Sequence, residues 1–343
     1  TLQLKEQQFM SDWRAIEQTI NSTDISLNDL FIIYQYHILG QNPKKSLNDE
    51  LQRAFKGKDS NELIGEIKNF ANTYETKIYN PENPTPTLYS FWYIRWTMYW
   101  KTILLTALHT NYDDYEPLVK ELQRFYYLYW IAGKTLSQIK QTSFNLIKSI
   151  KEKKPISEIS KELNEKLKTD NIIELATSNL ASDYITSYGW CKPLLILMEY
   201  NATDTSKLSF VALDKELHLE HILPQKYSKF KEWEHITDEM ATEWVDSSGN
   251  ITLLCGKKNI EASNNPFDIK MDIYKGKGKY DNKNDKITAF SITQSIVSDY
   301  ESGKYDKKWT LESMQDRKKW FIKEVEEMFD IKLSEKVEVL APA

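Results

Sequence analysis

The stretch His218-Leu219-Glu220-His221-Ile222-Leu223-Pro224 decides how the rest of this 343-residue chain is interpreted. Short runs of apolar and β-branched residues predict a strand here, which ends at Pro224. Gly249-Asn250-Ile251-Thr252-Leu253-Leu254 predicts a second strand, and the segment 259–274 predicts a helix that Pro266 restarts. The expected order is therefore strand, loop, strand and helix, within a segment of about 70 residues.

Outside this segment the sequence predicts helices almost throughout. Apolar residues recur with the spacing of one helix face from residue 1 to about 200, and two more helices are predicted near 284–300 and 309–329. We therefore expect a mainly α protein. Its expected parts are a helical connector or scaffold domain over 1–204 and a second domain over 205–343, with a strand-containing core at about 208–280 and C-terminal helices.

Three tryptophans, Trp92, Trp96 and Trp100, recur at the spacing of a single helix face inside the most apolar stretch, 91–108. Such a row of rings could stack on nucleic-acid bases if it were exposed. Buried aromatic side chains dominate the packing of protein cores, however, so a core helix is the favoured interpretation. The stretch also contains an arginine and a lysine, which argues against a membrane span.

The composition excludes several classes of protein. The formal net charge is −5, so no overall basic field attracts nucleic acid, and any contact with a polyanion must come from a local patch. The two cysteines, Cys191 and Cys255, are too few for a disulfide framework or a four-thiolate zinc site. No secretory signal opens the chain, which starts without a methionine. We expect a cytoplasmic protein, either a piece of a longer chain or a split subunit.

One histidine, an adjacent carboxylate and a later amide form a minimal set for metal-assisted hydrolysis of a phosphodiester. Histidine can deprotonate water near neutral pH, because its unperturbed pKa is about 6.5. A divalent cation offsets the charge that builds on the phosphate and the leaving oxygen, and hard cations bind carboxylate and amide oxygens. Glu220 and His221 would point to opposite sides of a continuous strand. Because Pro224 ends the strand, we expect both side chains to converge on one site.

The combination of Glu-His-Ile-x-Pro with two later asparagines resembles the HNH (His-Me finger) nucleases. A closer resemblance, over about residues 208–280, is to the C-terminal nuclease domain of the GmrSD-type, modification-dependent (type IV) restriction endonucleases. The features that carry it are His-x-Glu-His-Ile-x-Pro (218–224), Gly-Asn-Ile-Thr-Leu-Leu (249–254), Asn259, Ser263-Asn264, Phe267, Lys270 and Tyr274. The resemblance implies a small ββα-metal unit and a metal-dependent DNA endonuclease that defends against modified phage DNA.

The resemblance also implies roles for individual residues. His221 would be the general base, and Asn250 would orient its ring through a hydrogen bond. Glu220 and Asn259 would hold one Mg²⁺ or Mn²⁺. No zinc is expected, because the CxxC pairs of many HNH enzymes are missing. The residues expected to contact DNA or its phosphates are His218, which could instead buttress the site, Lys257, Lys258, Asn264 and Lys270.

The partners that the resemblance implies are double-stranded, modified DNA and a ParB-like nucleotide-hydrolysing domain. Family members usually begin with such a domain, and no motif of it is found in this sequence. The domain would therefore lie N-terminal to this chain or on a separate one. No membrane partner is expected, and an oligomer is left open.

Several alternatives compete with the nuclease interpretation. The two histidines of the 218–224 motif could be paired strand side chains or, with His235, part of a structural zinc site. Neither alternative explains the joint spacing of the motifs. In function, the alternatives are a non-catalytic DNA-binding subunit with a degenerate nuclease fold, and a helical module that relays signals from a nucleotide-hydrolysing partner. The segment 270–286, with six lysines and three aspartates, is either a solvated linker or a basic patch beside the site.

Overall fold

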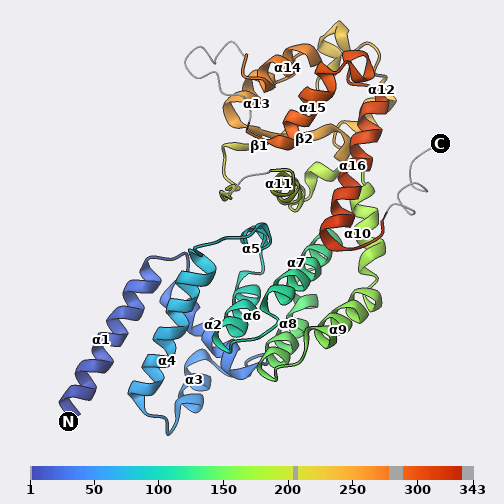
Figure 1. Cartoon of the computed structure of the whole chain (residues 1–343). Helices are drawn as coiled ribbons and strands as arrows, with labels where there is room; N and C mark the ends of the chain where they lie inside the picture. The colour runs from blue at the N-terminus through green and yellow to red at the C-terminus, as the bar shows by residue number, and fades with distance from the viewer. Residues whose placement is uncertain (1, 204–207, 278–288, 334–343) are drawn as a thin grey trace. The chain divides into compact units, whose positions relative to one another are not determined.

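The computed structural model describes residues 2–203, 208–277 and 289–333. Over these ranges the chain is mainly helical and contains a two-stranded sheet (Figure 1), which confirms the predicted fold class at this level. None of the helices within the described ranges combines the length and the apolar character needed to cross a membrane. Most of the lysine-rich segment 270–286 lies outside the described residues.

The first compact unit consists of Thr1–Tyr129 and Lys134–Asp170. Its helices are α1 (Leu2–Asn21), α2 (Leu27–Leu39), α3 (Leu47–Phe55), α4 (Ser60–Thr73), α5 (Pro86–Ser90), α6 (Thr97–His109), most of α7 (Tyr115–Ile131), α8 (Leu136–Lys151) and α9 (Ile156–Thr169). Helix α6 contacts α2, α4 and α8, and residues 99–107 within it are all buried. Helix α6 is therefore the central helix of this unit.

The tryptophan row belongs to this core, as the favoured interpretation predicts. Trp100 is fully buried in α6, and its ring lies edge-on to that of Trp92 at a centroid distance of 5.5 Å. The three residues do not share one helix, because Trp92 lies in a separate 3₁₀ turn (Phe91–Tyr93) and Trp96 precedes the first residue of α6. With Trp92 and Trp96 only partly exposed, the row offers no open stacking platform.

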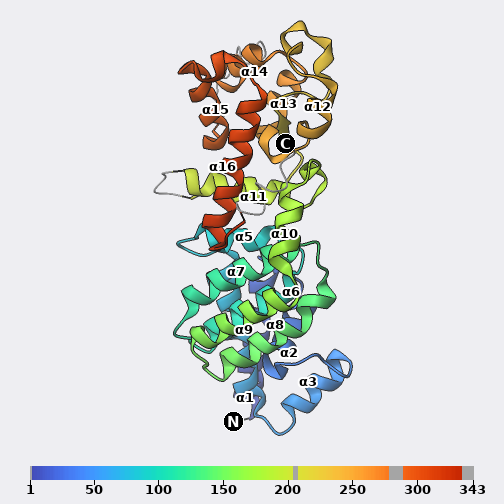
Figure 2. The same ribbon diagram turned by 90° about the vertical axis from the view of Figure 1, so that its right-hand side faces the viewer.

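The second compact unit consists of Trp130–Gly133 and Asn171–Ala343. Its elements, drawn from two sides in Figures 1 and 2, are α10 (Ile172–Ala181), α11 (Cys191–Ala202), β1 (Leu217–His221), α12 (Asp238–Trp244), β2 (Ile251–Cys255), α13 (Gly256–Ala262), α14 (Phe267–Tyr274), α15 (Ser291–Glu301) and α16 (Leu311–Phe329). Strands β1 and β2 are antiparallel, and α13 follows β2 directly. The predicted order of strand, loop, strand and helix is confirmed.

The compact units divide near Asp170, earlier than the change in sequence character near residue 205. The reason is that α11 packs on β2 and α15 of the second unit. The carboxylate of Glu199 in α11 accepts hydrogen bonds from the backbone nitrogens of Ser291, at 2.8 Å, and Ile292, at 3.0 Å. These nitrogens open α15, where helix N–H groups lack partners within the helix. The change in sequence near residue 205 marks where strand-forming residues begin. The packing of α11 against β2 and α15 places the helices before that point in the second unit as well.

Helix α16 is held close to the start of β2. A Cβ atom on Gly249 would lie 2.2 Å from the carbonyl oxygen of Met314, so only glycine fits at this approach. The buried Arg317 donates to the carbonyl oxygens of Ile251, at 3.1 Å, and Ile292, at 3.3 Å. Burial lowers the pKa of Arg317 to about 10. The C-terminal helix is thus part of the scaffold that positions the strands.

Candidate active site

Glu220 and His221, the last two residues of β1, have side chains in different environments. Glu220 pairs with Thr252 and His221 with Ile251 in the antiparallel register, so the strand continues through His221. Successive side chains of a strand point to opposite faces. The expectation that Glu220 and His221 converge is therefore wrong for this structure, because the strand ends after His221 rather than before it.

The Glu220 environment is closed. Its Oε1 accepts hydrogen bonds from Lys270 Nζ at 2.7 Å and from the hydroxyl of Tyr274 at 2.8 Å. Lys270 also donates to the backbone carbonyl of His221 at 2.6 Å. The side chains of Glu220 and Lys270 are 4% and 0% exposed, so this ion pair is fully buried.

Burial dominates the electrostatics of this pair. It lowers the pKa of Lys270, and the attraction of Glu220 opposes that effect. Burial, together with the charge of Glu220, raises the pKa of Tyr274 well above its ordinary value. Tyr274 therefore stays protonated and donates to Glu220, while α14 supplies both partners of the carboxylate.

The His221 environment is partly open. The Nε2 atom of the ring lies 2.8 Å from Oδ1 of Asp246, and the two side chains are 20% and 26% exposed. The hydroxyl of Thr186 donates to the same Asp246 oxygen at 2.8 Å. A partly exposed histidine supported by a carboxylate is an arrangement that can move a proton to or from a bound water.

Asn250 does not orient the His221 ring, contrary to the expectation from the resemblance. Its amide is fully buried, and its Oδ1 accepts from the backbone nitrogen of Leu223 at 2.7 Å and from Trp309 Nε1 at 3.0 Å. Its Nδ2 donates to the carbonyl oxygens of Leu223 and Val245. Every hydrogen-bonding position of this amide is used by the loop around it or by Trp309, so Asn250 has a structural role here.

Two of the expected phosphate contacts are buried. Lys270 is held by Glu220, and Lys258 is 6% exposed and donates to the carbonyl oxygen of Ile273 at 3.1 Å. Neither ammonium can reach a phosphate in this conformation, because both side chains are buried and both ammonium groups donate to acceptors inside the protein. Both expectations are therefore wrong for this structure.

The remaining expected residues lie on or near α13. Lys257 is exposed, whereas Asn259 and Asn264 are partly exposed. His218 is partly exposed, and its Nε2 lies 2.9 Å from the carbonyl oxygen of Lys215, which fits the buttress alternative. The structure thus leaves Lys257, Asn259 and Asn264 accessible to a ligand.

In this conformation Glu220 is buried and paired with Lys270, so it does not share an open cation site with Asn259. Across the described residues, no group of three or more histidine, cysteine, aspartate or glutamate side chains could hold a metal ion. The Oε1 atom of Glu220 already accepts from Lys270 and Tyr274. Lys270 would have to release Glu220 before that carboxylate could bind a metal.

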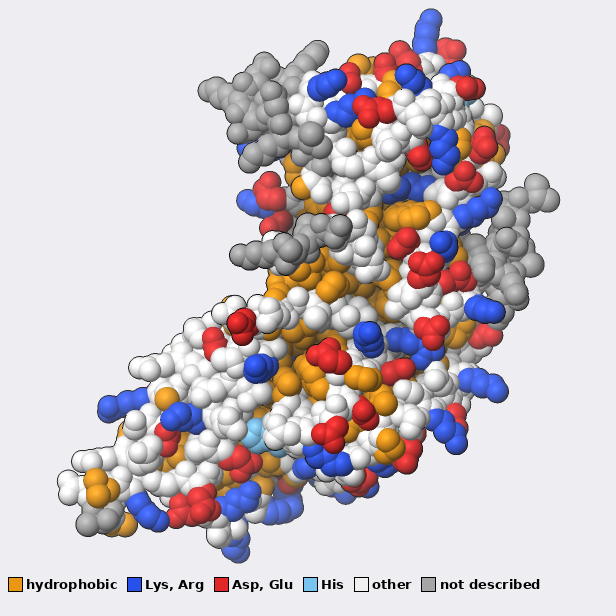
Figure 3. Space-filling model, in the orientation of Figure 1, with side chains coloured by type: hydrophobic (Ala, Val, Ile, Leu, Met, Phe, Trp, Pro, Cys, Tyr) orange, Lys and Arg blue, Asp and Glu red, His pale blue; other side chains and the backbone are white. Residues whose placement is uncertain are grey.

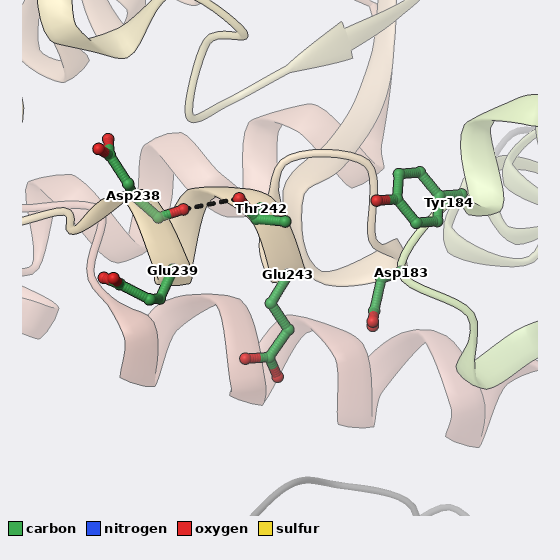
Figure 4. Close-up of a pocket in the computed structure, with 6 residues that line it drawn as sticks. All are labelled: Asp183, Tyr184, Asp238, Glu239, Thr242 and Glu243. Carbon is green, nitrogen blue, oxygen red and sulfur yellow. Dashed lines mark hydrogen bonds between the residues drawn. The ribbon is translucent and has the colours of Figure 1, made fainter.

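An acidic hollow lies next to the segment that supports Asp246. Helix α12 forms one side, and Asp183 and Tyr184 form the other (Figure 4). Its lining residues are Asp183, Tyr184, Asp238, Glu239, Thr242 and Glu243. Tyr184 also pairs with Asp246 through a parallel bridge between the two backbones. Four carboxylates repel a phosphate, so we do not expect DNA to enter here.

The visible surface offers no large patch of one charge. On the face shown in Figure 3, lysine and arginine side chains alternate with aspartate and glutamate. This mixture of charges agrees with the net charge of −5.

Sequence reasoning missed Asp246 and Thr186. Asp246 lies in the acidic insert between the two strands, where several acidic residues are equally plausible partners. Thr186 precedes the motif by more than thirty positions, and no pattern connects them. The pairing of Glu220 with Lys270 was missed for the same reason, although Lys270 and Tyr274 are among the residues that carry the resemblance.

Comparison with known proteins supports the resemblance at the level of the family. Residues 160–324 match the family model described as GmrSD restriction endonucleases, C-terminal domain. The match extends from within α9 to within α16, and so includes the strands, Asp246 and Thr186. Comparison with curated proteins and with solved structures gave no match. Residues 160–324 are therefore similar to the C-terminal domain of the GmrSD restriction endonucleases, which is consistent with the resemblance drawn from the sequence.

Proposed function

We propose that this chain hydrolyses phosphodiester bonds of DNA as an HNH-type endonuclease, with His221 as the general base. One observation carries the proposal: the His221 ring is partly exposed at the end of β1 and is held by the carboxylate of Asp246. A histidine placed in this way can accept a proton from water near neutral pH. The restriction endonuclease family makes DNA the matching substrate.

In the proposed reaction, His221 takes one proton from a water molecule. The water oxygen forms a bond to phosphorus, and the bond between phosphorus and the leaving sugar oxygen breaks. The leaving oxygen then takes a proton from solvent. Modified phage DNA as the substrate, and a ParB-like nucleotide-hydrolysing partner, belong to the proposal through the family resemblance.

A requirement for Mg²⁺ or Mn²⁺ also belongs to the proposal through the resemblance alone. A bound divalent cation would offset the charge on the phosphate. We assign no step to it, because Glu220 is held by Lys270 in this structure. Asn259 is the member of the expected metal pair that remains partly exposed.

The experiment is plasmid cleavage by the chain with Mg²⁺ or Mn²⁺, with and without EDTA. We expect cleavage that EDTA abolishes and that Asn259→Ala weakens strongly. Asn265→Ala is the matched control, because Asn265 lies nearby and its Nδ2 donates to the backbone carbonyl of Glu261 at 2.8 Å. Full cleavage in EDTA would contradict the metal requirement, and absence of cleavage under every condition would contradict the nuclease.

A second candidate is a non-catalytic DNA-binding or signal-relay subunit. The buried pair of Glu220 and Lys270 favours it, because this pair withholds an expected metal ligand. The same assay separates the two candidates: DNA binding without cleavage, at every metal concentration, supports the second one.

A further inference from the structure

We infer that Asp246 is the residue that positions His221, and that Thr186 holds Asp246 in place. The inference rests on the proposed role of His221 as general base. Oδ1 of Asp246 receives two hydrogen bonds of 2.8 Å, one shared with Nε2 of His221 and one donated by the Thr186 hydroxyl. Through this one carboxylate oxygen, His221 in β1 is connected to Thr186, which lies outside both strands and α13.

The contact with Asp246 fixes which ring nitrogen of His221 carries the proton. An ionised carboxylate only accepts hydrogen bonds, so Nε2 of a neutral His221 must carry the hydrogen and donate it. The lone pair is then on Nδ1, which has no hydrogen-bond partner among the described residues. Nδ1 is therefore the atom that takes the proton from water, and the carboxylate stabilises the imidazolium that forms.

Asp246 is itself held from two directions. It follows α12, which ends at Trp244, and its backbone pairs with Tyr184 in a parallel bridge. Thr186 lies two residues after Tyr184, in the 3₁₀ turn Ile185–Ser187. A carboxylate with a fixed backbone and a second donor keeps its geometry while the imidazole ring changes charge.

A purely structural tie would use the same contacts, so the test needs a readout that such a tie would not move. If Asp246 only connected the 184–187 segment to the loop before β2, its variants would be less stable but the tautomer of the His221 ring would not change. A positioning role predicts a changed ring tautomer and a lower kcat in variants that remain folded.

The first measurement is ¹⁵N NMR of the histidine rings in the full chain at a pH where they are neutral. The chain has five histidines, so the His221 signals can be identified by their loss in His221→Gln. We expect the wild-type ring to show Nε2 protonated and Nδ1 unprotonated. In Asp246→Ala we expect the averaged signals of two exchanging tautomers.

The second measurement is DNA cleavage by Asp246→Asn, which keeps the size of the side chain and removes its charge. We expect kcat to fall by roughly 10²-fold with KM almost unchanged, because general-base catalysis contributes about 10²–10⁴-fold. Thr186→Val should give a smaller fall in kcat. Glu243→Gln is the matched control, since it removes a nearby carboxylate that lines the hollow, and it should cleave as the wild type does.

An unchanged His221 ring in Asp246→Ala would overturn the inference, as would wild-type kcat in folded Asp246→Asn. The two proposals can fail separately. If the wild type cuts no DNA while the ring responds to Asp246→Ala as expected, the proposed nuclease fails and the fixed tautomer stands.

Discussion

Glu220 and His221 are neighbours in one strand, yet their surroundings differ in almost every respect. Glu220 is 4% exposed and bound by Lys270 and Tyr274, both from α14. His221 is 20% exposed and meets Asp246 from the loop that precedes β2. The difference shows how one strand can serve two purposes, because alternation sends one side chain into the core and the next toward solvent. We expect substitutions on the Glu220 side to change stability, and substitutions on the His221 side to change activity.

The largest expected effect on stability is that of Lys270→Met. Removing one partner of a buried ion pair leaves the other charge uncompensated, which typically costs about 3–5 kcal/mol. Urea unfolding of the wild type and the variant measures the difference in free energy of unfolding. Lys257→Met is the matched control, because Lys257 is exposed in the same unit, and it should change stability little. Equal stability of Lys270→Met and the wild type would contradict the closed environment described for Glu220.

The motif shows what sequence alone could predict here. Short runs of apolar and β-branched residues predict both strands, and the motif they surround makes His221 the candidate general base. The polar partners could not be predicted, because Lys270 lies 50 residues from Glu220 and Thr186 lies 60 residues from Asp246. Such pairings depend on how helices pack against the sheet, and no local periodicity encodes that packing.

Asn250 illustrates a related limit. Its position after glycine fits a family motif, and the resemblance implies that it orients the His221 ring, whereas its amide bonds to Leu223, Val245 and Trp309. Whether an amide orients a catalytic ring or closes a loop depends on neighbours from elsewhere in the chain, such as Trp309. The role of a polar residue is therefore less predictable than its location.

A smaller loss of stability is expected for Asn250→Ala. The substitution leaves the buried nitrogen of Leu223 and Trp309 Nε1 without their acceptor, and an unsatisfied buried group costs about 1–3 kcal/mol. Thermal unfolding measures the loss, and Asn264→Ala at a partly exposed asparagine is the control. If Asn250→Ala melted like the wild type, the structural role of this amide would be wrong.

The first unit contains a histidine, His37, that is buried, whereas His221 is partly exposed. Burial, with the charges of His109 and Lys151, lowers the pKa of His37 to about 3. The unfolded chain therefore binds a proton at His37 more readily than the folded chain does. The stability that neutral His37 contributes is fully present above about pH 6.5 and is lost as the pH falls toward the folded pKa. We expect a loss of up to about 1.4 kcal/mol per pH unit below pH 6.5.

The measurement is thermal unfolding between pH 7 and pH 5, where few carboxylates titrate. His37→Gln should flatten the pH dependence of the melting temperature, and His235→Gln, at an exposed histidine, should leave it unchanged. An equally steep slope in His37→Gln would assign the acid sensitivity to other groups.

The most direct test of the central claim is the single-turnover rate of DNA cleavage by His221→Ala, measured beside the wild type with Mg²⁺ or Mn²⁺. Loss of a general base typically costs about 10²–10⁴-fold in rate. The melting temperature should stay close to that of the wild type, because His221 is partly exposed. A folded His221→Ala chain that has lost cleavage is the predicted result. Cleavage at the wild-type rate would contradict the assignment of His221 as the general base.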